Sequence, residues 1–266
     1  SIEPQSGHIK AWVGGVDNQN FAYDHVISTR QVGSTFKPFV YATAIQNGYS
    51  PCHEVPNVEY TFHKGEFGLL KDWTPRNAGG SSNGCKVSLK YAIANSMNTI
   101  TAWVMKQFGP QAVMEQARAM GIKNKLDPVP SLCLGVADLS VYEMVGANAT
   151  FANKGVYIEP TMYTRIEDKH GNVIIDRSPE TSEAMSEETA YVMLDLMKGI
   201  VDGEYNECMG NDRKARGKNP MYTSGTGMRL RGSISEKRPY VGHQYPIAGK
   251  TGTTQNNSDG WFMGLT

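Results

Sequence analysis

Apolar positions recur at helical spacing through the middle of the chain. The first run begins at Ser34, and its apolar members are Phe36, Val40, Ala44 and Ile45. A period of about 3.6 residues predicts an amphipathic helix, which we expect to end at Asn47 and Gly48 because such residues commonly follow the last turn. The same spacing predicts further helices over residues 88–94, 99–108, 110–120, 139–153 and 186–201. Ser34 is therefore expected at a helix start, and residues 95–98 in a break between two helices.

Alternating apolar and polar positions, which are typical of strands, lie near both ends of the chain. They predict one N-terminal strand over residues 8–15 and two C-terminal strands over residues 245–253 and 260–265. Residues 163–175 have the pattern of a hairpin, and residues 49–83 that of a long surface connection. Terminal strands with helices between them predict an α+β domain, in which N- and C-terminal strands form an antiparallel sheet against a helical cluster.

The charge balance and the cysteines narrow the classes of partner. The 266 residues contain 26 Lys and Arg and 26 Asp and Glu, so no overall field attracts nucleic acid or an anionic membrane. No apolar stretch approaches the roughly 20 residues of a spanning helix.

The cysteines are too scattered for a zinc site, and we expect no metal and no cofactor. They are Cys52, Cys85, Cys133 and Cys208. Two states stay open for them: up to two disulfides in an oxidising compartment, or buried free thiols.

Three short groups of residues carry candidate chemistry. They are Ser34-Thr35-Phe36-Lys37, Ser96-Met97-Asn98 and Lys250-Thr251-Gly252-Thr253. In a chain of this composition each of the first two is expected about once by chance. The context of the first adds weight, because a serine at a helix start and a lysine one turn later lie on the same helical face.

The first group has the residues of an activated nucleophile. A serine hydroxyl attacks only when a base removes its proton, and an amine can act as that base only when it is neutral. Free lysine has a pKa of about 10.4, so Lys37 needs burial or a neighbouring cation, for which Lys250 is the candidate. We expect the backbone N–H groups of Ser34 and Thr253 to face the developing oxyanion.

The other two groups have residues suited to substrate binding and proton transfer. In a break between helices, the Ser96 hydroxyl can relay a proton and the Asn98 amide can hold a peptide group. On the predicted C-terminal strand, Gly252 allows a substrate backbone to approach closely, while Thr251 and Thr253 offer hydroxyls to a carboxylate.

The order Ser-x-x-Lys, Ser-x-Asn, Lys-Thr-Gly resembles that of the penicillin-binding proteins and the serine β-lactamases. The flanks RQVGSTFKPFVY (residues 30–41) and KTGTTQNNSDGWFMG (residues 250–264) are similar to the transpeptidase domain of class A penicillin-binding proteins. Residues 1–15, 87–98 and 130–155 follow the same family pattern, so the resemblance covers essentially the whole chain. It implies the α+β fold shared by penicillin-binding proteins and serine β-lactamases.

The resemblance implies a peptidoglycan D,D-transpeptidase that β-lactams inhibit covalently. Ser34 is then the acylated nucleophile, Lys37 its general base and Ser96 the relay toward the leaving amine. The substrate-binding residues are Asn98, Lys250, Thr251, Gly252 and Thr253. The donor is a stem peptide ending in D-Ala-D-Ala, and the acyl group passes to an amine of a neighbouring stem. With water in place of that amine, the same site is a carboxypeptidase.

The resemblance also implies a cellular setting. The partners are peptidoglycan stem peptides, β-lactam antibiotics and a cell-wall synthesis complex, with no nucleic acid. The location is the outer side of the bacterial cytoplasmic membrane. We expect residues 1–266 to form the transpeptidase domain without its final strand and helix. The N-terminal membrane anchor and the glycosyltransferase domain of class A proteins are expected outside this sequence, and the anchor would be the domain's only contact with the membrane.

Two other classes of protein share these motifs. A β-lactamase needs a carboxylate that activates water, and Glu143, five residues before Asn148, is the candidate, although its apolar helix favours a core or capping role. A penicillin sensor would be acylated without turnover. Separately, Arg229 and Arg231 beside Gly225-Thr226-Gly227 form a candidate carboxylate or partner patch.

Overall fold

The computed structural model describes residues 1–16, 23–78, 82, 84–205, 223–232, 242–254 and 258–266. The α-helices of these ranges are α1 (Lys37–Gln46), α2 (Leu89–Ala94), α3 (Asn98–Ala119), α4 (Val141–Ala152) and α5 (Glu187–Asp202). Shorter 3₁₀ turns are η1 (Gly33–Phe36), η2 (Glu66–Gly68), η3 (Pro130–Leu134) and η5 (Met228–Arg231). Every predicted helix is confirmed, with one difference. The helices expected over residues 99–108 and 110–120 form the single α3, which is kinked at Gly109 just before Pro110.

Serine side chains determine where three of these helices begin. Ser88 accepts a hydrogen bond from the Tyr91 N–H at the start of α2, and Ser186 accepts one from the Thr189 N–H at the start of α5. Ser140 and Glu143 form a reciprocal capping box at the start of α4. Such caps satisfy backbone donors that have no partner inside the helix, so these three starts are encoded locally.

The strands of the described residues are short and pair in antiparallel twos. The bounds are β1 (Arg30–Gln31), β2 (Glu54–Pro56), β3 (Lys86–Ser88), β4 (Asp138–Leu139), β5 (Val156–Ile158), β6 (Arg165–Glu167), β7 (Val173–Asp176), β8 (Thr181–Glu183), β9 (Glu204–Tyr205), β10 (Thr223–Ser224), β11 (Ala248–Thr253) and β12 (Gly260–Leu265). The pairs are β1 with β4, β2 with β3, β5 with β8, β6 with β7, β9 with β10, and β11 with β12. The predicted C-terminal strands and the predicted hairpin are confirmed.

The expected N-terminal strand is corrected by the structure. Residues 8–15 are not a continuous strand, and their pairing consists of isolated bridges from Ile9 to Ile2 and from His8 to Thr161. The N-terminal segment does lie near β12, because Ser1, Ile2 and Pro4 line a cavity of about 490 Å³ together with that strand and α4. Within the described residues, the sheet beside the helices is therefore formed by β11 and β12 alone. Apolar alternation alone does not specify a strand partner.

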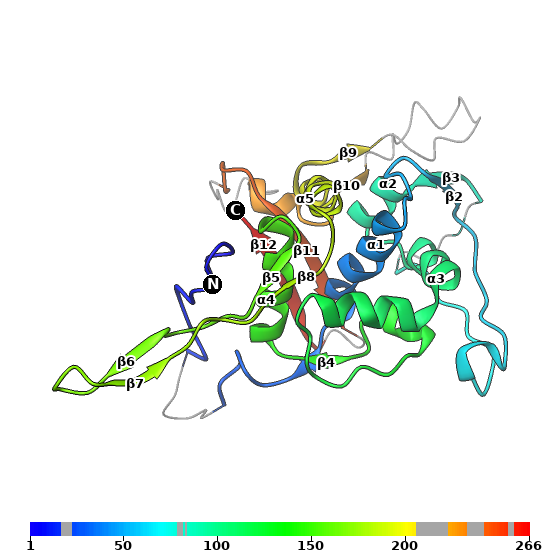
Figure 1. Ribbon diagram of the computed structural model, residues 1–266. Helices are drawn as coiled ribbons and strands as arrows, with labels where there is room; N and C mark the ends of the chain where they lie inside the picture. The colour runs from blue at the N-terminus through cyan, green and yellow to red at the C-terminus, as the bar shows by residue number, and fades with distance from the viewer. Residues whose placement is uncertain (17–22, 79–81, 83, 206–222, 233–241, 255–257) are drawn as a thin grey trace.

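The core surrounds α1. Nine of its ten residues, 37–45, are buried, including Lys37. In Figure 1, α1, α2 and α3 lie together on one side, and α4 and α5 lie beside β11 and β12. Phe36, Phe39 and Tyr41 are fully buried there. Because α1 is enclosed on all sides, its first turn is held in a fixed position next to β11.

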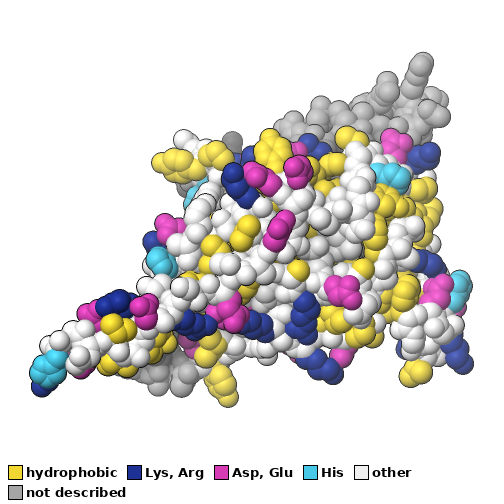
Figure 2. Space-filling view, viewed as in Figure 1, with side chains coloured by type: hydrophobic (Ala, Val, Ile, Leu, Met, Phe, Trp, Pro, Cys, Tyr) yellow, Lys and Arg dark blue, Asp and Glu magenta, His cyan; other side chains and the backbone are white. Residues whose placement is uncertain are grey.

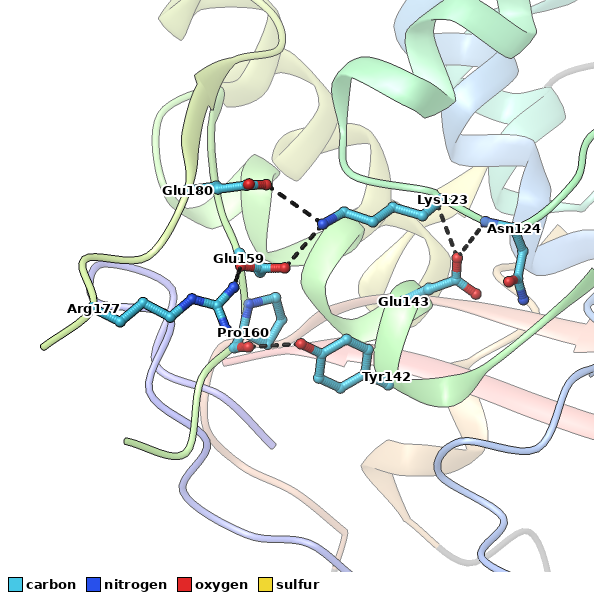
Figure 3. Close-up of polar contacts among 8 residues, drawn as sticks. All are labelled: Lys123, Asn124, Tyr142, Glu143, Glu159, Pro160, Arg177 and Glu180. Atoms are coloured by element: carbon cyan, nitrogen blue, oxygen red, sulfur yellow. Dashed lines mark hydrogen bonds and ion pairs between the residues drawn. The ribbon is translucent and has the colours of Figure 1, made fainter. Parts of the chain in front are cut away.

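The β6–β7 hairpin projects away from this body (Figure 1). Its base is held by a polar network in which Lys123 donates to Glu159 (2.9 Å) and approaches Glu180 (3.5 Å), while Arg177 pairs with the same Glu159 carboxylate (Figure 3). The Tyr142 hydroxyl donates to the Pro160 carbonyl (2.7 Å). Acidic and basic side chains are scattered over the face shown in Figure 2, which agrees with the balanced composition.

The cysteines are in different states. Cys85 is disulfide-bonded, Cys52 is an exposed free thiol and Cys133 is a buried free thiol. Burial raises the pKa of Cys133 to about 12. Cys208 lies outside the described residues. Among the described helices, none has the length and apolar character that crossing a membrane requires.

Candidate active site

Ser34 lies in η1, in the turn that leads into α1, with its side chain half-buried. The preceding Gly33 has a φ of 53°, and a Cβ at this position would lie 2.6 Å from the Thr253 carbonyl oxygen. Only a glycine combines that backbone conformation with so close an approach. Similarly, a Cβ on Gly252 would lie 2.8 Å from the Thr35 methyl group. The turn that carries Ser34 is therefore pressed directly against β11.

Lys37 follows Ser34 by one turn, and its ammonium group is buried. Nζ donates to the Ser96 carbonyl oxygen (2.6 Å) and to Asn98 Oδ1 (2.7 Å), and it lies 3.2 Å from Ser96 Oγ. Burial lowers the pKa of Lys37 to about 7, because a charged group loses its hydration when it leaves water. Of the two causes expected from the sequence, burial is the one that acts on Lys37, and its role as a base stays a prediction.

Ser96 lies between two lysines. Lys250 Nζ donates to Ser96 Oγ (2.9 Å) and to the Thr251 carbonyl oxygen (2.8 Å). Burial, followed by the charge of Lys37, lowers the pKa of Lys250 well below its ordinary value. Ser96 has a left-handed φ of 53°, which is uncommon for a residue with a side chain. Such backbone conformations cluster at functional sites.

Asn98 begins α3, and both ends of its amide have partners. Oδ1 accepts from Lys37, and Nδ2 donates to the Arg76 carbonyl oxygen (2.7 Å). Asn98 thus holds Lys37 in place and fastens the long connection to α3. The structure shows these two contacts of Asn98 within the protein. Its expected contact with substrate stays a prediction.

Asn77 is a positioning residue that sequence analysis missed. Its Oδ1 accepts from the backbone N–H groups of Asn98 (2.7 Å) and Thr99 (3.1 Å), so it caps α3 from the long connection. It lies 21 residues before Asn98. A capping residue normally directly precedes its helix, so no local pattern indicated this role.

The two threonines of β11 face the same way. Lys250 and Gly252 are buried, whereas Thr251 is half-buried and Thr253 exposed. This alternation is the two-residue period of a strand, and it directs the hydroxyls away from the core. Thr226, which was not among the predicted site residues, places its Oγ1 2.7 Å from Thr251 Oγ1.

Glu143 has a structural position. Its carboxylate accepts from the backbone N–H groups of Lys123 (3.0 Å) and Asn124 (2.7 Å) (Figure 3). It also accepts from the N–H (3.3 Å) and the hydroxyl (3.1 Å) of Ser140. With these contacts it caps α4 and fixes the segment after α3. The capping role is confirmed, and both carboxylate oxygens are engaged in these structural contacts.

Comparison with known proteins identifies the family. Residues 2–266 match the family model described as "Penicillin binding protein transpeptidase domain". The chain belongs to this family. Among curated relatives, Penicillin-binding protein 2D of Bacillus subtilis is 31% identical, and the match covers 100% of this chain and 35% of that protein. Penicillin-binding protein 1A of Aquifex aeolicus is 28% identical, with 100% and 32% covered. The transpeptidase domain thus spans about a third of these relatives, and the resemblance to class A proteins is confirmed.

Solved structures confirm the fold. Penicillin-Binding Protein 1A from Haemophilus influenzae superposes on the transpeptidase domain with a TM-score of 0.79 at 23% identity, covering 99% of this chain and 40% of that one. PonA1 from Mycobacterium tuberculosis, in complex with penicillin V, superposes with a TM-score of 0.71 at 23% identity, covering 100% and 64%. The α+β fold expected from the sequence is therefore that of the penicillin-binding proteins.

Proposed function

We propose that this transpeptidase domain is a serine D,D-transpeptidase of peptidoglycan, acylated at Ser34 by stem peptides that end in D-Ala-D-Ala. One observation carries the proposal: two buried lysines meet at the Ser96 hydroxyl beside the turn of Ser34. Within the part of the chain that the structure describes, neither lysine donates a hydrogen bond to a carboxylate. Burying two amines in this way is costly and is typical of sites that need a neutral amine.

The hydrogen bonds support a direction for proton transfer. Protonated Lys37 has three N–H donors and three acceptors within 3.2 Å. Neutral Lys37 has two donors and a lone pair, so Ser96 can then donate its proton to Lys37 while accepting one from Lys250. The group best suited to exchange protons with both lysines is therefore the Ser96 hydroxyl.

Acylation uses these groups in sequence. Neutral Lys37 takes the Ser34 proton while Oγ attacks the carbonyl carbon of the penultimate D-Ala. The N–H groups of Ser34 and Thr253 stabilise the oxyanion. As the C–N bond breaks, Ser96 gives its proton to the leaving D-Ala amine and regains one from Lys37. Lys250, Thr251 and Thr253 hold the terminal carboxylate of the donor through this step.

Deacylation reverses the proton movements. An amine of a neighbouring stem attacks the ester, loses a proton through Ser96, and Ser34 leaves with the proton held by Lys37. Water in place of the amine gives carboxypeptidation. A β-lactam acylates Ser34 in the same way, but its leaving nitrogen stays tethered after the ring opens, so the ester persists. We place this reaction on the outer side of the cytoplasmic membrane. The membrane anchor, the glycosyltransferase domain and the synthesis complex stay predictions.

The test is the intact mass of the purified protein after incubation with benzylpenicillin, with the Ser34→Ala variant as control. We expect the parent protein to gain the mass of one drug and the folded variant to gain none. A folded parent without an adduct would contradict the proposal. Rapid hydrolysis of the drug without a lasting adduct would instead indicate a β-lactamase.

A second measurement separates an enzyme from a penicillin sensor. A peptide ending in D-Ala-D-Ala is incubated with the parent protein and with Ser34→Ala, and free D-Ala is measured over time. We expect more than one equivalent of D-Ala from the parent. An adduct with penicillin but at most one equivalent of D-Ala would identify a sensor.

A further inference from the structure

The turn Gly225-Thr226-Gly227, between β10 and η5, is held from two sides. The Gly225 N–H donates to the Gly203 carbonyl (3.1 Å) and the Gly227 N–H to the Ile200 carbonyl (2.8 Å), both at the end of α5. A Cβ on Gly225 would lie 2.2 Å from the Ile200 carbonyl oxygen. On the other side, the Thr226 N–H donates to the Ala94 carbonyl (3.0 Å) at the end of α2. The turn is therefore fixed next to the Ser96 segment.

The side chain that this turn presents reaches the site. Thr226 Oγ1 lies 2.7 Å from Thr251 Oγ1, and Thr251 directly follows Lys250 on β11. We infer that Thr226 is a positioning residue for the binding of the donor's terminal carboxylate, acting through the Thr251 hydroxyl. This inference rests on the proposed function, and none of the expected site residues included it.

The chemistry of a hydroxyl explains how Thr226 would act. A threonine hydroxyl has one proton and two lone pairs. When Thr251 donates its proton to a carboxylate, its lone pairs are free to accept the Thr226 proton. This second bond fixes the rotation of the Thr251 hydroxyl and polarises it toward the anion. Without it, Thr251 must give up rotational freedom each time a substrate binds.

Of the two arginines beside the turn, Arg231 is engaged in contacts inside the fold. Arg231 binds Asp202 through two hydrogen bonds (2.5 and 2.7 Å) and donates to the carbonyl oxygens of His243 and Tyr245 (2.6 Å each). This corrects its expected role in a carboxylate or partner patch, because its guanidinium is used to tie η5 to α5 and to the segment before β11. Of the expected patch, only the exposed Arg229 is left without such a tie among the described contacts.

The test compares Thr226→Val, which removes the hydroxyl but keeps the shape, with Thr226→Ser, which keeps the hydroxyl. Thr181→Val on the exposed strand β8 is a matched control. The rate constant of acylation is measured with benzylpenicillin, which has a carboxylate, and with its neutral methyl ester. One net hydrogen bond corresponds to a factor of about 5 to 10. We expect Thr226→Val to lose that factor with benzylpenicillin only, while Thr226→Ser and Thr181→Val retain the parent rate.

The outcomes separate this inference from the proposed function. A parent protein that forms no adduct would overturn both. An adduct on the parent, together with an unchanged rate for Thr226→Val, would overturn the inference alone. So would an equal loss with both drugs, or a Thr226→Ser variant as slow as Thr226→Val, because either result indicates a role in folding and not in carboxylate binding. A thermal melt of each variant checks its fold.

Discussion

Two groups of lysines in this molecule differ in burial, in hydrogen-bond partners and in the direction of their pKa shifts. Lys37 and Lys250 are fully buried and share the Ser96 hydroxyl. Lys123 is largely exposed and pairs with Glu159 and Glu180 at the base of the projecting hairpin (Figure 3). Burial lowers the pKa of both buried lysines, whereas the hydrogen bond that Lys123 donates to Glu159 raises the pKa of Lys123. The same side chain is therefore a potential base at one place and a permanent cation at the other.

The difference shows what a lysine does in each setting. An ion pair with an exposed cation contributes modestly to stability, because water already solvates the cation, although the Glu159 carboxylate is only 14% exposed. A buried lysine without a carboxylate partner weakens the fold and persists where its neutral form is needed. Location therefore distinguishes functional from structural lysines better than residue type does.

The largest effect is expected from removing the buried amine. Lys37→Met should reduce the rate of acylation by benzylpenicillin about 10²- to 10⁴-fold, the usual contribution of a general base. Lys123→Met is the matched control and should leave the rate unchanged. Stopped-flow or quenched mass measurements give both rates, and near-parent labelling by a folded Lys37→Met variant would remove Lys37 from the mechanism.

The pH dependence of acylation is the second expectation. Lys37 acts as a base only when neutral, and its pKa is lowered to about 7. The acylation rate should therefore be level above that pH and fall about tenfold per pH unit below it, as protonation removes the neutral amine. Rates from about pH 5 to 11 test this expectation, because the range then includes the ordinary lysine pKa. A midpoint near the ordinary lysine value of about 10.4 would show that Lys37 is not the titrating base.

The smallest effect is expected at the base of the hairpin. Glu159→Gln removes the carboxylate that pairs with Lys123 and Arg177. The free energy of unfolding should fall by about 1 kcal/mol or less, and by less still in high salt, because partly exposed ion pairs are screened. Urea unfolding at two salt concentrations measures the change. Slower acylation by this variant would mean that the hairpin base is coupled to the active site. It would contradict the view that Lys123 and its partners have a structural role only.

Much of the architecture follows from local sequence. The helices that begin after Ser88, Ser140 and Ser186 were predicted over residues 88–94, 139–153 and 186–201, and their starts are fixed by side-chain caps. The paired strands β11 and β12 were predicted from alternation and a polar turn. The N-terminal strand was not found, because residues 8–15 alternate in the same way but their sheet partner is a matter of tertiary contact.

Some residues of the site were predicted from local sequence, and others were revealed only by the structure. The motif order pointed to Ser34, Lys37, Ser96, Asn98 and the β11 residues, and the structure brings Lys37, Ser96, Asn98 and Lys250 into direct contact. Asn77 could not be found from the sequence, and Thr226 was named there only as part of the turn beside an arginine patch. Each acts on a residue more than 20 positions away, from a segment whose own pattern is only that of a loop.

The sequence by itself determined which residue types were available and which short elements carry them, because helix periodicity, caps and strand alternation depend on neighbours along the chain. Tertiary structure alone brought Ser96 between two lysines that lie 59 and 154 residues away from it. It also set their proton affinities, since the pKa of a lysine depends on the water and charges around it and not on its neighbours in sequence. Local sequence therefore supplied the two lysines and the serine, and only the fold buried both amines against one hydroxyl.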